Sequence, residues 1–189
     1  LTFDKTHVVD IVDITTGQLC RPLSGHSDIV REVAFDTSSH WLASASDDGS
    51  SRVWELSDDR WQLRTVVQNL ASTAGADPES SHLRSVSFAP DGQRFTTGGV
   101  DGTAPTWSTR WQSGNSAELA VARPPGDDAM VAHVRFAPDG DRAAIRWFDG
   151  LVTLHELDGA RAGLQRTLPA GGLQSVGFAG SPRALGRDS

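Results

Sequence analysis

The stretch Ser24–Leu56, SGHSDIVREVAFDTSSHWLASASDDGSSRVWEL, contains three short β-prone runs separated by turn residues. The first run ends at Phe35, the second lies at 41–43, and the third lies at 52–54. A tight Asp-Asp-Gly turn at 47–49 separates the second run from the third. Alternating apolar residues bounded by Asp, Ser and Gly indicate an antiparallel β-meander. A fourth strand is predicted from Trp61 to Val67.

The same template recurs along the chain. The phenylalanine that ends the first run returns at intervals of roughly 42 to 53 residues, and the turn aspartate and the third-run tryptophan position move with it. These three positions recur at matching intervals, which indicates a repeat. A single recurring dipeptide would not be sufficient evidence for one. The equivalent positions are Phe35, Phe88, Phe136 and Phe178; Asp48, Asp101 and Asp149; and Trp54, Trp107 and His155.

The Gly25-His26 opening and the Trp54-Glu55 ending of this unit resemble the WD-repeat family, with Trp-Glu in place of Trp-Asp. The resemblance implies an all-β fold, a β-propeller built of four-stranded antiparallel blades. Because family propellers usually have seven blades and strand propensity is poor after Gly180, we expect an open arc of about four blades. The alternative is a closed four-bladed ring. The expected segments are 1–23 (end of a blade), 24–68, 69–122 with a long entry loop, 123–168 (degenerate) and 169–189 (start of a blade).

The family pattern also implies a hydrogen-bonded group in each blade. In the first it falls on His26, Ser44, Asp48 and Trp54, with the carboxylate and the hydroxyl on opposite sides of the histidine ring. An Asp-His-Ser set is also typical of hydrolases, but its gradual loss along the chain favours a structural role. Later units keep Thr97, Asp101 and Trp107, and then only Asp149, with Ile145 and His155 at the Ser and Trp positions.

Composition narrows the functional classes. The net charge of −7 and the pI of about 5.2 argue against a nucleic-acid binder. One cysteine, Cys20, excludes an intrachain disulfide and a multi-cysteine zinc cluster. No apolar run approaches the length of a membrane span, and the histidines lack a ligand spacing. We therefore predict no cofactor, no metal site and no membrane partner.

The resemblance implies a non-catalytic scaffold that binds proteins or peptides at the rim of the propeller channel. We expect it in the cytoplasm, as the sensor or docking part of a larger signalling protein, whose further blades are also possible partners. The Ala-, Arg-, Gly- and Asp-rich character resembles bacterial WD-repeat proteins. The alternative is a propeller enzyme, a hydrolase or lyase, using the channel mouth. Candidate rim residues are Arg31, Asp47, Arg84, Val100, Phe148 and Gln174, with Ala132 in the same register.

Overall fold

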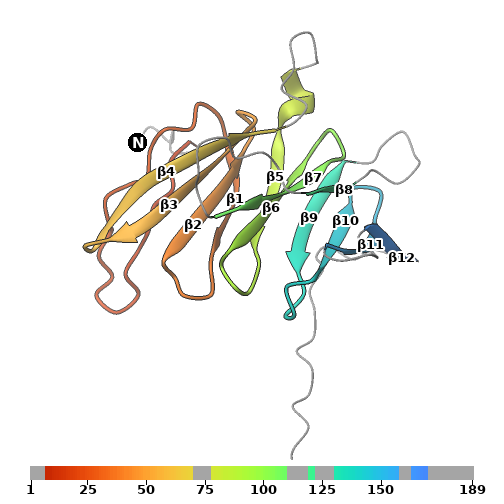
Figure 1. Cartoon of the computed structure of the whole chain (residues 1–189). Helices are drawn as coiled ribbons and strands as arrows, with labels where there is room; N and C mark the ends of the chain where they lie inside the picture. Colours follow the sequence, from red (N-terminus) through yellow and green to blue (C-terminus); the bar gives the residue numbers. More distant parts are fainter. Residues whose placement is uncertain (1–6, 70–77, 110–118, 122–129, 158–162, 170–189) are drawn as a thin grey trace, which may run out of the picture.

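The computed structural model describes residues 7–69, 78–109, 119–121, 130–157 and 163–169. Within them the chain forms three four-stranded antiparallel sheets, each with its strands in sequence order (Figure 1). The first contains β1 (Val30–Phe35), β2 (Trp41–Ser46), β3 (Ser50–Ser57) and β4 (Arg60–Gln68). The second contains β5 (Leu83–Phe88), β6 (Arg94–Gly99), β7 (Ala104–Ser108) and β8 (Leu119–Val121). The third contains β9 (Val131–Phe136), β10 (Arg142–Trp147), β11 (Leu151–Glu156) and β12 (Gly163–Pro169).

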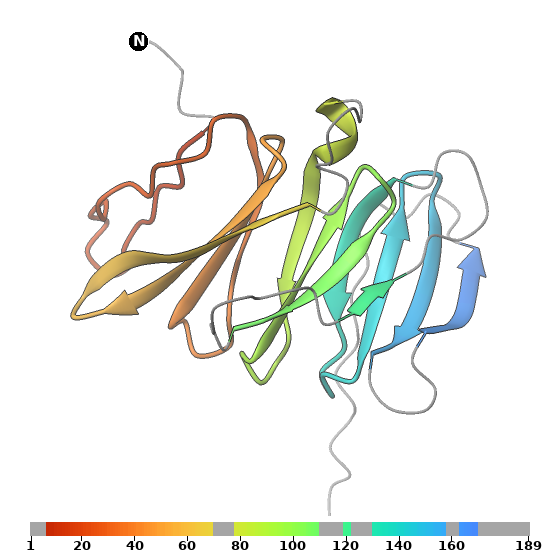
Figure 2. The ribbon, with the colours of Figure 1, turned by 45° about the horizontal axis from the view of Figure 1, so that its top comes forward.

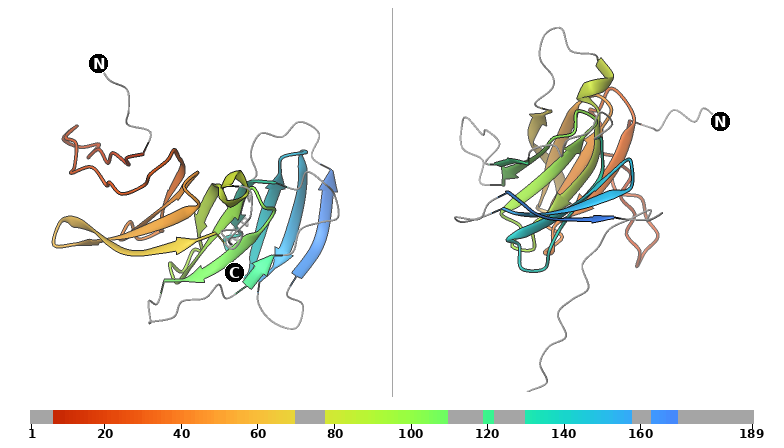
Figure 3. Two further views of the ribbon diagram at one scale, coloured as in Figure 1. Left: turned by 90° about the horizontal axis from the view of Figure 1, so that it is seen from above. Right: turned by 90° about the vertical axis from the view of Figure 1, so that its right-hand side faces the viewer.

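Residues 7–23 form an N-terminal hairpin beside the first sheet. Antiparallel bridges join Val9 to Leu23 and Val12 to Leu19. The Asp13 carboxylate closes its turn by accepting the backbone N–H of Thr15 at 2.7 Å. Seen from above, this hairpin stands at the free face of the first sheet, and the other two sheets follow on the opposite side (Figure 3).

The turns between the second and third strands have one conformation in all three sheets. Gly49, Gly102 and Gly150 adopt φ angles of 78°, 77° and 88°, which a side chain would make unfavourable. The aspartate before each glycine accepts a backbone N–H two residues further on, from Ser50, Thr103 and Leu151 respectively. The Asp-Gly pairs of the repeat therefore specify the turn locally.

Neighbouring sheets stand face to face (Figure 2), and apolar side chains fill the space between them. Between the first two sheets, Ala43, Ala45 and Val53 meet Val86 and Phe88. At the next interface the backbone of Gly98 approaches Val131 closely, because a Cβ at Gly98 would stand 2.4 Å from Val131 Cγ1. A third cluster joins the N-terminal hairpin to the first sheet through Val9, Leu23, Leu42 and Trp54.

The sheets form an open row, as predicted, and no ladder joins one described sheet to another. The ladder that would define a closed ring involves residues 182–188, which lie outside the described residues. So do Gln174, the 169–189 segment beyond Pro169, and the loop at 122–129. In the second sheet, β7 is short and contains Pro105, whose carbonyl accepts a hydrogen bond from Thr96 Oγ1 at 2.9 Å.

The entry loop of the second sheet has structured ends. Residues 69–81 are small, polar and without periodicity, so the sequence predicts only a loop there. Asn69 is buried, donates its backbone N–H to the Gly49 carbonyl at 2.8 Å and its side-chain N–H to the Ser81 carbonyl at 3.0 Å. Residues Pro78–Ser81 form the short 3-10 helix η1. Composition misses these anchors because they depend on contacts with the turn of the first sheet.

Candidate functional site

The first sheet holds the hydrogen-bonded group around His26. His26 Nδ1 lies 2.8 Å from Asp48 Oδ2, and Nε2 lies 2.6 Å from Ser44 Oγ. The Trp54 indole stands edge-on to the imidazole, with ring centroids 6.2 Å apart. His26, Ser44 and Trp54 are buried, so each polar group needs its partner.

In the second and third sheets, different side chains form the hydrogen bonds of the equivalent buried region. In the second, the Trp107 indole donates to Thr97 Oγ1 at 3.1 Å, while Asp101 binds the hydroxyl of Thr103. The third sheet has no tryptophan at position 155. Instead Trp147 of β10 donates its indole N–H to Thr153 Oγ1 at 2.8 Å, and His155 Nε2 lies 2.8 Å from the same oxygen. Asp149 is exposed and lies outside that group.

The pKa values of Asp48 and His155 are both lowered, by different causes, which leaves the carboxylate charged and the imidazole neutral. Burial alone would raise the pKa of Asp48, but hydrogen bonds from His26, Ser50 and the backbone N–H groups of Ser27 and Ser50 outweigh it and hold that pKa well below its usual range. Burial lowers the pKa of His155 to about 4, so this ring is neutral at pH 7. A charged carboxylate and a neutral imidazole are therefore structural parts of different sheets.

Four side chains at one end of the first two sheets form what we call the rim cluster: Arg31, Asp47, His82 and Arg84. Arg31 Nε donates to Asp47 Oδ2 at 2.8 Å, and Arg31 Nη2 contacts the same oxygen. The other carboxylate oxygen, Oδ1, lies 3.7 Å from His82 Nδ1 and 3.8 Å from Arg84 Nη1. The Asp47 side chain is only 4% exposed, whereas those of Arg31 and Arg84 are 36% and 32% exposed.

β-Bulges aim the two arginines. The ladder between β1 and β2 skips from Val30 to Glu32, which leaves Arg31 as the extra residue. The ladder between β5 and β6 skips from Leu83 to Ser85, which leaves Arg84. A bulge releases one residue from the ladder and redirects its side chain. In the third sheet the skipped residue is Ala132, between Val131 and His133, which brings no charge.

The other described rim candidates, Val100 and Phe148, lie at the same end of their sheets. One backbone hydrogen bond recurs there, from the N–H groups of Asp47, Val100 and Phe148 to the carbonyls of Ile29, His82 and Met130, each at 2.9 Å. Val100 is half-buried. Phe148 is 64% exposed and adds an apolar contact surface on the third sheet.

Glu32 joins the first strands of all three sheets. Its carboxylate accepts the Ser85 hydroxyl, the backbone N–H of Val86 at 3.0 Å, and Arg135 Nη2 at 2.6 Å. Ser85 Oγ in turn accepts the backbone N–H of Val134 at 3.1 Å. This network holds β1, β5 and β9 beside one another. Glu32 and Ser85 come directly after the bulge residues Arg31 and Arg84, so the network also holds the backbone at the two bulges.

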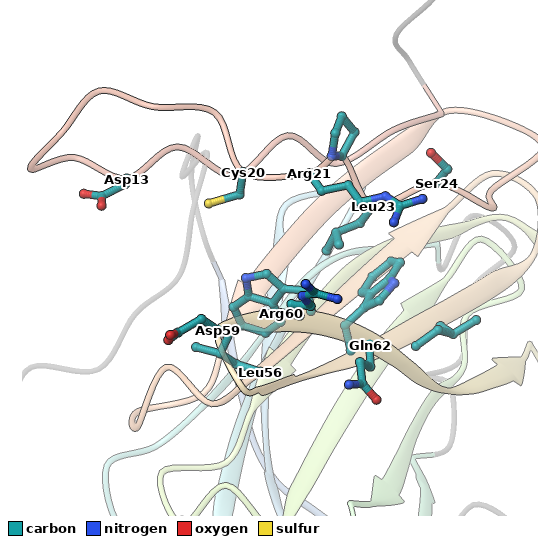
Figure 4. A pocket seen from close by; sticks show the side chains of 13 residues that line it. Asp13, Cys20, Arg21, Leu23, Ser24, Leu56, Asp59, Arg60 and Gln62 are labelled. Carbon is teal, nitrogen blue, oxygen red and sulfur yellow. The ribbon is translucent and has the colours of Figure 1, made fainter.

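A cleft of about 1060 Å³ lies between the N-terminal hairpin and the β3–β4 hairpin (Figure 4). Trp54, Trp61 and Leu56 give it an apolar side. Arg21 and Arg60 face its middle, while Asp13 and Asp59 lie towards one end. The positive and negative side chains balance, so the cleft does not select a ligand charge. Cys20, half-buried, also lines it.

Sequence reasoning did not select His82 or Glu32 for the site, and did not find the cleft. By sequence register His82 is equivalent to Ile29 and not to the motif histidine His26. Its contact with Asp47 arises because β5 packs beside β1 and β2. Among the described residues no three His, Cys, Asp or Glu side chains gather as metal ligands.

Comparison with known proteins identifies the repeat. The family model "WD domain, G-beta repeat" matches residues 17–55 and 69–108. These two segments are similar to the WD40 repeat. The match covers the Asp-Gly turns of the first two sheets and most of the β-strands that surround them, and it includes Arg31, Asp47, His82 and Arg84.

Similar proteins carry the repeat in several contexts. The chain is 33% identical over 96 residues to periodic tryptophan protein 2 homolog of Dictyostelium discoideum, covering 51% of this chain and 9% of that protein. It is 25% identical over 138 residues to guanine nucleotide-binding protein subunit beta of Oryza sativa subsp. indica, covering 68% and 33%. It is 33% identical over 69 residues to ribosome biogenesis protein ERB1 of Scheffersomyces stipitis, covering 36% and 8%.

The chain therefore spans a third or less of the length of these relatives. All three relatives come from eukaryotes, which gives the expected bacterial origin no support. No helix in the described part of the chain is long and apolar enough to cross a membrane.

Proposed function

We propose that this WD40-repeat chain binds a protein or peptide partner at the end of the sheets that carries the rim cluster and Phe148. The observation that supports this most directly is the pair of bulge arginines. Bulges are enriched beside functional sites, where they redirect a side chain, and arginines and aromatic residues are the types that contribute most to interfaces. Partner binding here needs no chemistry from the chain itself.

The hydrolase alternative requires a nucleophile that a substrate can reach. Ser44 is fully buried at 0% exposure, and its hydroxyl is enclosed with His26 inside the first sheet. At the rim, Asp47 is paired with Arg31 and covered, so it is not placed to act as a general base. The Asp-His-Ser geometry therefore supports a structural role for these three residues.

The setting that we propose is a docking segment within a longer cytoplasmic signalling protein, with other blades of that protein as additional neighbours. Similarity to a guanine nucleotide-binding protein subunit supports this, since a subunit works inside an assembly. Similarity to a ribosome biogenesis protein indicates that the same repeat also serves elsewhere, so signalling is the finer part of the proposal.

The test compares the two ends of the sheets in the intact gene product. One variant carries Arg84→Glu and Phe148→Asp; the matched control carries Asp91→Lys and Arg142→Glu, at the turns of the opposite end. Partners captured by proximity labelling in the cell of origin should be lost from the rim variant and kept by the control. Equal capture by both variants, with unchanged melting temperatures, would contradict a rim-binding function.

A further inference from the structure

We propose that the rim cluster is a receptor for a carboxylate side chain, and that the partner segment it takes is an acidic peptide. This rests on the proposed function and names the chemistry of its partner. The cluster differs from scattered surface arginines because a buried acid organises it. Asp47 holds Arg31 from its own sheet and attracts His82 and Arg84 from the next sheet.

A ligand at the rim cluster can reach the arginine and histidine side chains but not the Asp47 carboxylate. Asp47 Oδ2 is occupied by Arg31, and Oδ1 is buried beneath the next sheet with no hydrogen bond in the described structure. The exposed polar parts are the guanidinium groups of Arg31 and Arg84 and the edge of the His82 ring, which is 19% exposed. An incoming group therefore meets donors, and the negative charge that fixes them stays below the surface.

The donors retain capacity for a ligand. Arg84 approaches Asp47 at 3.8 Å, which is ion-pair distance but too long for a hydrogen bond. All five N–H groups of its guanidinium lack a hydrogen-bond acceptor among the described residues. Arg31 uses two of its N–H groups on a single oxygen. A carboxylate placed between the two arginines would gain charge-assisted hydrogen bonds that are shorter and stronger than neutral ones.

The two arginines differ in how far the nearby acids neutralise them. Arg31 is paired with Asp47 and is also attracted by Asp28, a carboxylate that accepts the backbone N–H of Ile29 at 2.7 Å. Arg84 approaches Asp47 only at 3.8 Å, so its charge is the less neutralised of the two, and Asp48 is bound to His26. A cationic ligand would meet two arginines, and a neutral one would leave the Arg84 donors without an anionic partner.

Preorganisation adds to the affinity. Both arginines start from bulges whose backbone is fixed by Glu32 and Ser85, so little side-chain freedom remains to be lost on binding. Phe148, exposed at the same end, provides an apolar neighbour. The fitting segment therefore combines an aspartate or glutamate with an apolar residue.

The experiment uses fluorescent peptides and the full chain. Three peptides share one sequence that contains a leucine, and they differ only in carrying two glutamates, two glutamines or two phosphoserines. The glutamate peptide should bind at least roughly tenfold more tightly than the glutamine peptide, as expected for hydrogen bonds to a charged group. Raising the salt concentration should weaken this binding, because both arginines are partly exposed.

Arg84→Ala should reduce the affinity for the glutamate peptide roughly tenfold, and Arg84→Lys should restore only part of it, because lysine lacks the planar fork. The matched control is Arg64→Ala, an exposed arginine of β4 that pairs with Glu55 away from the rim. Circular dichroism and melting temperatures confirm that each variant is folded. Equal binding of the glutamate and glutamine peptides, or an Arg84→Ala variant that binds normally, would overturn the proposal.

Binding of the phosphoserine peptide alone would also overturn it, since the site would then require the greater charge of a phosphate. The result of the peptide experiment can be distinguished from the result of the test of the proposed function. If the rim variant loses its cellular partners while no acidic peptide binds, the interaction face stands and the carboxylate chemistry fails. If acidic peptides bind while the rim variant keeps its partners, the carboxylate site stands and the interaction face fails.

Discussion

The first and second sheets carry the same apolar pattern but bury it differently. In β5, Val86 and Phe88 are 1% and 8% exposed because they pack against the first sheet. Their equivalents in β1, Val33 and Phe35, are 43% and 48% exposed. The N-terminal hairpin covers Leu42 and Trp54 but leaves these two residues uncovered. One template therefore produces core or surface depending on whether a complete sheet stands beside it.

The largest expected effect separates the two phenylalanines. Phe88→Ala removes a ring from the interface between sheets and should cost roughly 3–5 kcal/mol of unfolding free energy. Phe35→Ala should cost only about 1 kcal/mol, because its main described partner is Trp61, with ring centroids 5.7 Å apart. Urea unfolding of both variants measures the difference. Equal losses would show that Phe35 is buried in the protein in solution.

Much of this fold could be predicted because its signals are local. The Asp-Gly turns need only a glycine in the left-handed region, and the recurring phenylalanines mark strands that alternate in and out. The exposure of Phe35 could not be predicted, because it depends on which element stands opposite. The pairing of Ser44 with His26 follows strand alternation, and the structure brings these two residues together as expected.

The rest of the site depends on contacts between sheets. His82 faces Asp47 only after β5 has packed on the first sheet, and nothing near residue 82 in the sequence indicates that neighbour. The third sheet is similar: its missing motif tryptophan is compensated by Trp147 from another strand, which no fixed spacing predicts. Register gives Arg31 and Arg84 the same position, four residues before each phenylalanine, and in the structure both are bulge residues.

The next prediction concerns His155, the buried histidine of β11 in the third sheet. The pKa of His155 is about 4 in the folded chain and near 6.5 when unfolded. Below pH 6.5 the unfolded chain binds a proton that the folded chain refuses, so stability falls between pH 6.5 and 4, by up to about 3 kcal/mol. His155→Gln should flatten this slope in urea titrations at several pH values. A small slope remains from His133, whose pKa burial also lowers.

A smaller effect, in a more acidic range, is expected for Asp48. Asp48→Asn should cost roughly 1–3 kcal/mol at pH 7, because His26 and Ser50 lose their charged acceptor. Since the folded pKa of Asp48 is lowered, its contribution is present above the unfolded value of 3.8 and is lost as the pH falls below it. The gap between variant and wild type should therefore narrow at pH 3.

The matched control for this change is Asp149→Asn on the third sheet. Asp149 is exposed and accepts only the backbone N–H of Leu151, at 2.9 Å, among the described residues. Its substitution should cost less than about 1 kcal/mol. If Asp149→Asn cost as much unfolding free energy as Asp48→Asn, the two turn aspartates would contribute equally to stability. That result would contradict the expectation drawn from their different hydrogen bonding.

The smallest effect concerns the connection between the first two sheets. Replacing residues 71–77, which are small and polar, with a Gly-Ser segment of equal length should leave the melting temperature nearly unchanged. Asn69→Ala should instead cost about 1–2 kcal/mol, because the Ser81 carbonyl loses its donor. Extending the replacement to residue 80 removes most of η1, including Pro78, and should give an intermediate loss. Thermal unfolding of the three variants ranks these effects. A large decrease in melting temperature caused by the 71–77 replacement would show that this segment packs on the sheets.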